Sequence, residues 1–143
     1  MDVTATLVAP CAPDALYRCV ADLGLYPEWL DIVPRAVPEG GDEPAWVVDL
    51  RGRLGPLARS KRLRMVRTVD SSPSRVVFER QERDDRAHSP WVLSADVEPF
   101  DGASRLTMQL HYGGGLWGPV LERILGDEIE RSKPRLLALV DHA

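Results

Sequence analysis

The sequence is poor in the residues that build disulfide frameworks and metal sites. Its 143 residues include two cysteines, Cys11 and Cys19, and three histidines. Two cysteines do not make a disulfide framework, and we expect both to be buried free thiols. His88, His111 and His142 lack the spacing of metal ligands. The sequence therefore predicts no metal site, and we expect no cofactor.

Long apolar runs, a secretion signal and an excess of basic charge are also missing. No run approaches the roughly 20 apolar residues that a membrane span needs, so we expect no integral membrane segment. The first four residues lack the basic and then apolar pattern of a signal peptide. The net charge is −4, from 18 basic and 22 acidic residues, which gives no overall attraction to nucleic acid. We expect a cytoplasmic protein that binds no nucleic acid.

One local cluster of basic residues stands out against this acidic balance. Arg59, Lys61, Arg62 and Arg64 fall on one predicted strand. Neighbouring strands carry acidic residues, namely Asp49, Glu79 and Glu82. We therefore interpret the basic run as half of a cross-strand charge ladder on the solvent face of a sheet, and not as a nucleic-acid site.

What the sequence does contain is a series of alternating apolar and polar residues, typical of half-buried strands. At 143 residues with 44% hydrophobic residues, the chain is large enough for one domain with a sizeable core. We predict strands over residues 3–8, 32–37, 45–51, 59–69, 75–81, 90–98 and 103–112. The second of these is interrupted by prolines and is expected at an edge. Two short helices are predicted over residues 13–21 and 25–30.

A long amphipathic helix is predicted over residues 115–141. At about 100° per residue, one narrow stripe holds Leu121, Leu125, Ser132, Leu136 and Leu139, with Glu128 at its near edge. A helix in a closed core usually has an unbroken apolar face. The carboxylate and hydroxyl in this stripe are typical of a helix that lines a cavity. We predict an α+β fold in which an antiparallel, curved sheet of six to seven strands wraps this helix.

Two local motifs, together with the order of the predicted strands and helices, indicate a known family. Ala12-Pro13 leads into the first helix, and Tyr26-Pro27-Glu28-Trp29 forms the second. With them, the chain resembles, over essentially its whole length, the START-related helix-grip superfamily shared by the birch pollen allergen and polyketide cyclases. That superfamily typically carries a tryptophan after a proline at this place. The resemblance implies an interior cavity that holds a small hydrophobic molecule, such as a lipid, a quinone, a polyketide or an aromatic.

The residues expected to bind such a ligand lie on the inner face of the sheet and helix. Tryptophans suit the walls of an apolar cavity because they combine a large ring with a polar tip. Tyr26 and Tyr112 are the expected hydroxyl donors. The predicted ligand-binding residues are Trp29, Trp46, Leu63, Met65, Arg67, Phe78, Trp91, Leu93, Met108, Leu110, Tyr112, Leu121, Leu125 and Glu128.

Arg67 and Glu128 are the candidates for a catalytic role. In the aromatase/cyclase branch, the resemblance implies a serine and an arginine two positions apart on one strand, and a tyrosine near the second helix. Here these positions fall on Met65, on Arg67 and near Val33, so only the arginine is kept. A buried guanidinium needs an acceptor, and Glu128 is a possible partner. Alternatively, a bulge turns Arg67 to solvent, and a small helix rotation takes Glu128 to the cavity rim; for Glu128 we favour the rim.

Three functions remain open at this point. The leading hypothesis is binding or transport of a small hydrophobic ligand by a monomer or homodimer, without chemistry. The first alternative is a polyketide cyclase, aromatase or dehydratase that acts on a poly-β-ketone. In that case, Arg67 polarises a carbonyl and Glu128 moves a proton. The second alternative is an assembly module that binds a larger protein.

Overall fold

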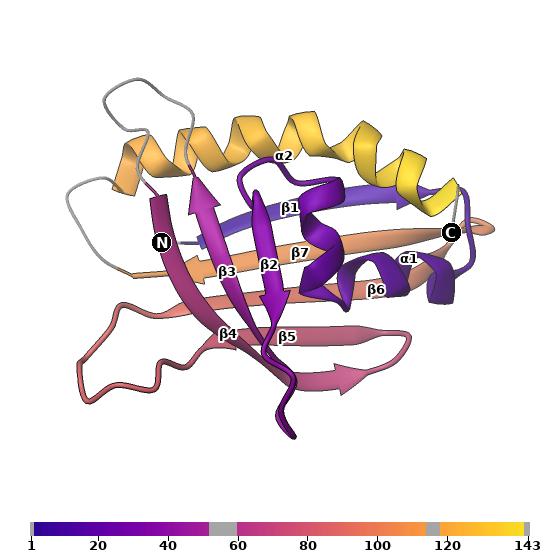
Figure 1. The fold of residues 1–143 in the computed structure, drawn as a ribbon. Helices are drawn as coiled ribbons and strands as arrows, with labels where there is room; N and C mark the ends of the chain where they lie inside the picture. Colours follow the sequence, from indigo (N-terminus) through magenta and orange to yellow (C-terminus); the bar gives the residue numbers. More distant parts are fainter. Residues whose placement is uncertain (1, 52–59, 114–117, 142–143) are drawn as a thin grey trace.

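The computed structural model describes residues 2–51, 60–113 and 118–141, and the described residues form one antiparallel sheet with a long C-terminal helix (Figure 1). Most predicted elements are confirmed to within a few residues. The elements are β1 (Asp2–Ala9), α1 (Pro13–Val20), the 3₁₀ helix η1 (Leu23–Glu28), β2 (Arg35–Pro38), β3 (Ala45–Arg51), β4 (Ser60–Ser71), β5 (Arg75–Arg80), β6 (Trp91–Phe100), β7 (Ala103–Tyr112) and α2 (Gly118–Asp141).

The seven strands form a sheet in the order β1-β7-β6-β5-β4-β3-β2, with every neighbouring pair antiparallel. From β2 to β7 the chain is a plain meander, and β1 pairs with the last strand. β2 lies at an edge, as the prolines in this segment predict, because proline has no backbone N–H to donate to a neighbouring strand. Ala5 lies opposite Met108, and Trp46 lies opposite Met65, so alternate positions of these strands share one face.

Local sequence explains two details of this sheet. Phe100 pairs with Ala103, which leaves Asp101 and Gly102 as a two-residue hairpin loop. Both have positive φ angles, of 47° and 76°, as the favoured hairpin turns require, and glycine and aspartate tolerate that conformation. In β4, the pairing register shifts between Arg67 and Val69 because of a bulge.

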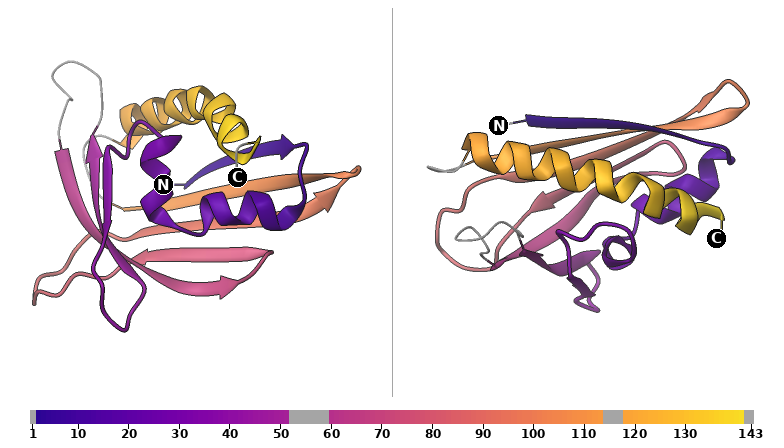
Figure 2. Two further views of the ribbon diagram at one scale, coloured as in Figure 1. Left: turned by 45° about the vertical axis from the view of Figure 1, so that its right-hand side comes forward. Right: turned by 90° about the horizontal axis from the view of Figure 1, so that it is seen from above.

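The helices lie on the concave side of the sheet. Figure 2 shows α2 running beside β1 and ending near α1, and α2 contacts both of them as well as η1. Pro13 begins α1, where its missing N–H group has no helical partner to lose. This arrangement confirms the predicted helix-grip architecture. No helix in the described part of the chain is long and apolar enough to cross a membrane.

An aromatic cluster fills the end of the sheet that faces η1. The rings of Tyr26 and Trp29 are 4.7 Å apart, and those of Trp46 and Phe78 meet edge-on at 5.6 Å. Tyr26 also meets Phe78 edge-on, at 6.3 Å, which joins the two pairs. Edge-on and tilted contacts of this kind add to the stabilisation that ring burial provides. The cluster therefore fixes η1 against β3 and β5.

Tyr17 ties α1 to the hairpin of β4 and β5. Its hydroxyl donates to the Asp70 carboxylate and lies 3.0 Å from the Arg75 carbonyl oxygen. Burial, together with the hydrogen bond to Asp70, raises the pKa of Tyr17 well above its usual value. The hydroxyl therefore keeps its proton, and with it the link between helix and sheet. Of the two free cysteines in this region, Cys19 is buried as predicted, but Cys11 is only half-buried.

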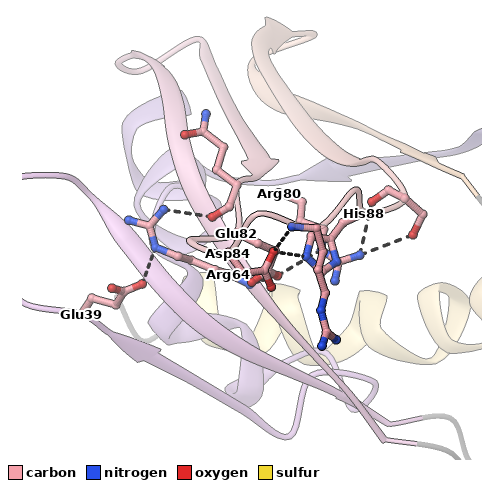
Figure 3. Close-up of polar contacts among 9 residues, drawn as sticks. Glu39, Arg64, Arg80, Glu82, Asp84 and His88 are labelled. Atoms are coloured by element: carbon pink, nitrogen blue, oxygen red, sulfur yellow. Dashed lines mark hydrogen bonds and ion pairs between the residues drawn. The ribbon is translucent and has the colours of Figure 1, made fainter.

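One pair of the predicted charge ladder forms on the outer face, and other charged residues take different partners, several of which Figure 3 shows. Lys61 does not belong to the ladder, because it lies opposite Leu50, which lines the cavity. Arg62 donates to Asp49 at 2.8 Å. Glu82 accepts from the Arg64 backbone N–H at 2.9 Å and from the Arg80 side chain at 3.1 Å, although Arg80 lies opposite Met65 in the inner-face register. Glu79 instead lies opposite Val66 in the pairing of β4 with β5. Arg59 lies outside the described residues.

Arg64 is buried on this outer face, which the charge-ladder interpretation does not predict. Its guanidinium donates to Glu39 at 2.6 Å, to Glu43 at 2.9 Å and to the Gln81 carbonyl at 2.9 Å. The loops before β3 and after β5 thus fold over the strand and are fixed there by one arginine. A buried guanidinium is tolerated because its donors are paired.

We predict that Phe78→Ala lowers the free energy of unfolding by about 3–5 kcal/mol, because Phe78 is fully buried at the centre of the aromatic cluster. Urea unfolding measures this change. Val69→Ala, at a side chain that is 37% exposed, is the control and should change stability by about 0.5 kcal/mol or less. A loss below about 1 kcal/mol for Phe78→Ala would show that the cluster is not tightly packed.

Candidate functional site

A cavity of about 130 Å³ lies between the concave face of the sheet, η1 and α2. Its wall is almost wholly apolar. The predicted residues that line it are Trp29, Leu63, Met65, Trp91, Leu93, Met108, Leu110, Leu125 and Glu128. These come from the C-terminal cap of η1, three strands of the sheet and α2, so segments far apart in the sequence meet at one site.

The burial of the inner-face side chains marks the position of this cavity. Leu63 and Met65 are buried, whereas Leu93, Met108 and Leu110 on the same face are only partly buried. An inward-facing leucine or methionine that is not fully covered borders free space. The sheet positions next to the cavity are therefore apolar side chains that α2 does not reach.

Three aromatic residues that we expected in the cavity wall belong to the packed core instead. Trp46 and Phe78 contact each other within the aromatic cluster, and neither lines the cavity. Tyr112 is 1% exposed, and its ring stacks on Trp91 at 5.3 Å, behind the cavity wall. All three are on the predicted face of the sheet. The prediction that these three side chains line the cavity was wrong, because neighbouring rings fill the space around them.

Arg67 is also outside the cavity wall and does not pair with Glu128. Its guanidinium donates to the Ala21 carbonyl at the C-terminal end of α1, at 3.0 Å, and lies 3.7 Å from the Asp70 carboxylate. It also lies over the Trp46 ring, 5.6 Å from the centroid. A cation beside the last carbonyls of a helix is favoured by the helix dipole. In the structure Arg67 thus joins α1 to β4.

Glu128 points inward, and the preference for a rim position was wrong. Its side chain is 3% exposed and lines the cavity. Arg131, one turn further along α2 and 61% exposed, donates to it at 2.7 Å. The surface arginine neutralises the carboxylate from outside, so the helix does not have to rotate to expose it. Leu125, Ser132 and Leu136 of the same stripe are buried too; Leu139 is partly buried, and the side chain of Leu121 lies outside the described part of the chain.

The hydroxyl groups at the cavity are engaged with the backbone. Tyr26 donates to the Val20 carbonyl at 2.8 Å, and Ser132 donates to the Ile129 carbonyl at 2.7 Å. Tyr26 was an expected donor to a ligand, but its proton is committed to that carbonyl. The indole N–H groups of Trp29 and Trp91 are buried and have no hydrogen-bond partner among the residues that the structure describes.

The cavity wall also includes residues outside the predicted ligand-binding set, although Tyr26 was expected as a donor and Ser132 as part of the helix stripe. The additional lining residues are Val3, Ala5, Leu23, Tyr26, Leu30, Ile32, Val33, Val48, Leu50, Ile129 and Ser132. For the strand residues a signal existed: Val48 and Leu50 continue the alternation that starts at Trp46, and Val3 and Ala5 face inward in the same way. Residues 30–33 were predicted as the end of a helix, 25–30, and the start of a strand, 32–37, but β2 begins only at Arg35 and this segment has no regular structure.

The chemistry of the cavity suits an apolar ligand of modest size. An engineered apolar cavity of about 150 Å³ holds a benzene molecule, so the space here corresponds to roughly one aromatic ring. Among the lining side chains that the structure describes, Glu128 is the one that carries a charge. Within the same described residues, no group of three or more histidine, cysteine, aspartate or glutamate side chains gathers as metal ligands would.

Comparison with solved structures identifies the fold. A START superfamily protein from Mycobacterium smegmatis matches with a TM-score of 0.72 and 15% identity, over 99% of this chain and 97% of that one. Protein CV1439 from Chromobacterium violaceum matches with a TM-score of 0.72 and 12% identity, over 97% and 96% of the two chains. At these identities the likeness shows a shared fold.

A third solved structure is the di-domain ARO/CYC StfQ from the steffimycin biosynthetic pathway, with a TM-score of 0.71 and 15% identity. The match covers 99% of this chain and 51% of StfQ. A search among curated proteins finds no match. At the level of sequence families, residues 1–140 match the family described as polyketide cyclase/dehydrase and lipid transport, and the chain belongs to that family.

Proposed function

We propose that this protein binds a small hydrophobic molecule in the cavity between the sheet and α2. The observation that carries the proposal is an apolar cavity whose wall is assembled from η1, β1, β3, β4, β6, β7 and α2. Empty space of this kind forfeits packing contacts, so a chain that encloses it without a ligand gives up stability. Membership of a family described in part by lipid transport supports the same function.

The cyclase alternative receives less support from the residues in place. The resemblance implies a serine, an arginine and a tyrosine in the pocket. Met65 and Val33, at or near the serine and tyrosine positions, line the cavity and are apolar. Arg67, at the arginine position, contacts α1 and is not part of the wall. Glu128 alone then remains as a proton-transfer group, with Arg131 as its partner.

The assembly-module alternative is also less well supported. It calls for an exposed apolar patch that a partner covers. The exposed large apolar residues in the described part of the chain are Val8, Val37, Val69 and Phe100, on four different strands. Single apolar residues scattered in this way are ordinary on a protein surface. The cytoplasmic location and the monomeric or dimeric state expected from the sequence stay predictions.

We predict that Ala5→Leu weakens binding of toluene, a probe of one aromatic ring, at least tenfold. Ala5 lines the cavity from β1, and the added carbons fill much of its volume. Isothermal titration calorimetry measures the affinity. The matched control is Thr6→Leu, the next residue of β1, whose side chain is exposed on the other face of the sheet. Equal toluene affinity in Ala5→Leu and wild type, or no binding by wild type, would contradict the proposal.

We predict that Arg67→Ala leaves toluene affinity within about twofold of wild type while it lowers the free energy of unfolding by about 1–2 kcal/mol, through loss of the Ala21 hydrogen bond and the contact with Trp46. Calorimetry and urea unfolding measure the two quantities. Arg105→Ala, at an exposed arginine paired with Glu98, serves as the control and should change both very little. A folded Arg67→Ala protein that had lost toluene binding would return Arg67 to the site.

A further inference from the structure

We propose that the cavity selects compact, uncharged ligands that carry an acceptor oxygen, with the indole N–H groups of Trp29 and Trp91 as donors and Glu128 as the group that excludes anions. The proposal rests on the proposed function, since it describes the ligand of the same cavity. Three features of the wall carry it: two unpartnered donors, one buried carboxylate, and the small volume.

The two indoles are the unusual polar groups of the wall. Trp29 is 3% exposed and Trp91 is 8% exposed, and both side chains line the cavity. Their N–H groups are buried and have no hydrogen-bond partner within the described part of the chain. Buried donors are paired in the great majority of cases, and an unpaired one is destabilising. The two tryptophans come from different elements, the C-terminal cap of η1 and the start of β6, and both line the cavity.

A hydrogen-bond acceptor on the ligand would provide the missing partner for one or both indole N–H groups. Both indole nitrogens are fully covered as the rings stand. The proposal therefore requires that at least one ring rotates when the ligand enters, so that its N–H faces the ligand oxygen. Tyr26 and Ser132 do not compete for that oxygen, because each hydroxyl proton is already committed to a backbone carbonyl. The complementary group is a carbonyl or ether oxygen on an otherwise apolar molecule.

The carboxylate of Glu128 sets the charge of the ligand. It lines the cavity at 3% exposure, and its partner Arg131 lies on the outer side of the helix with 61% of its side chain exposed. Among the described lining residues there is no cation to receive an anionic group. Lys61 lies nearby, with Nζ 5.5 Å from the centre of the Trp91 ring, but its side chain is exposed and is not part of the wall. An anion that enters the apolar space therefore loses its hydration without gaining a cationic partner, because Arg131 is already paired with Glu128 on the outer side of the helix.

Three probes of almost identical shape separate these effects. Acetophenone carries a carbonyl oxygen, isopropylbenzene replaces it with a methyl group, and benzoate replaces the methyl ketone with a carboxylate. Calorimetry should show acetophenone binding at least as tightly as isopropylbenzene, and benzoate binding at least tenfold more weakly than acetophenone. Without a donor in the wall, burial of the ketone oxygen would instead weaken acetophenone binding about tenfold relative to isopropylbenzene. That order would overturn the donor role.

The indole donors are tested directly by the ¹H–¹⁵N resonances of the side-chain N–H groups. Acetophenone should move the proton of at least one of Trp29 and Trp91 downfield, as a new hydrogen bond does, and isopropylbenzene should not. Trp29→Phe and Trp91→Phe assign the signals, and at least one of them should weaken acetophenone binding about tenfold with isopropylbenzene little affected. Trp46→Phe, the same change outside the cavity wall, is the control. If neither indole proton responds in the wild-type protein, the donor role is wrong whether or not the variants fold.

Glu128→Gln tests the charge rule. It should raise benzoate affinity about tenfold and leave acetophenone affinity within about threefold. Glu130→Gln is the matched control, since it removes an exposed ion pair with Lys133 at the same spacing on the same helix. Unchanged benzoate affinity in Glu128→Gln would overturn anion exclusion. Failure of both neutral probes to bind wild type would contradict the proposed function itself, whereas equal binding of all three would overturn only the selectivity.

Discussion

A single helix of 24 residues has to cover much of the concave face of a seven-stranded sheet. Seven strands about 4.8 Å apart span roughly 29 Å, whereas a helix with its side chains is about 10 Å across. Curvature of the sheet, together with α1 and η1, closes part of the difference. The part of the sheet that the helices leave uncovered borders the cavity. Its wall is apolar because these inward-facing positions belong to the hydrophobic face of the sheet.

The two ends of this arrangement are fixed in different ways. At the η1 end, the rings of Tyr26, Trp29, Trp46 and Phe78 pack together, and Tyr17 and Arg67 fasten α1 to β4 through polar contacts. On the outer face, Arg64 holds two loops through Glu39, Glu43 and the Gln81 carbonyl. None of these groups borders the cavity apart from Tyr26 and Trp29. Stability and ligand binding therefore depend largely on separate residues.

Strand alternation made most of the fold predictable, because it assigns each side chain to one face of the sheet. That information placed Leu63, Met65, Leu93, Met108 and Leu110 on the inner face, where the structure has them lining the cavity. Strand alternation did not show that Trp46, Phe78, Tyr112 and Arg67 lie outside the cavity wall. They share that face but lie where neighbouring rings or α1 fill the space, and a periodic pattern says nothing about which positions along a strand the helices cover. For Glu128, a helical wheel could not distinguish an inward side chain from one at the cavity rim, because a small rotation of the helix changes one into the other. The inward position is stabilised by Arg131, which donates to Glu128 from one turn further along the helix.

The central claim is that an apolar cavity, and not a fully packed core, lies between the sheet and α2. Diffraction from crystals held under xenon pressure tests it most directly, because xenon enters apolar cavities without needing a specific polar contact. The account predicts a xenon atom enclosed by Leu63, Met65, Met108 and Leu125, with the surrounding side chains unmoved. Side chains of the same residues in mutual contact, with no xenon between them, would contradict it.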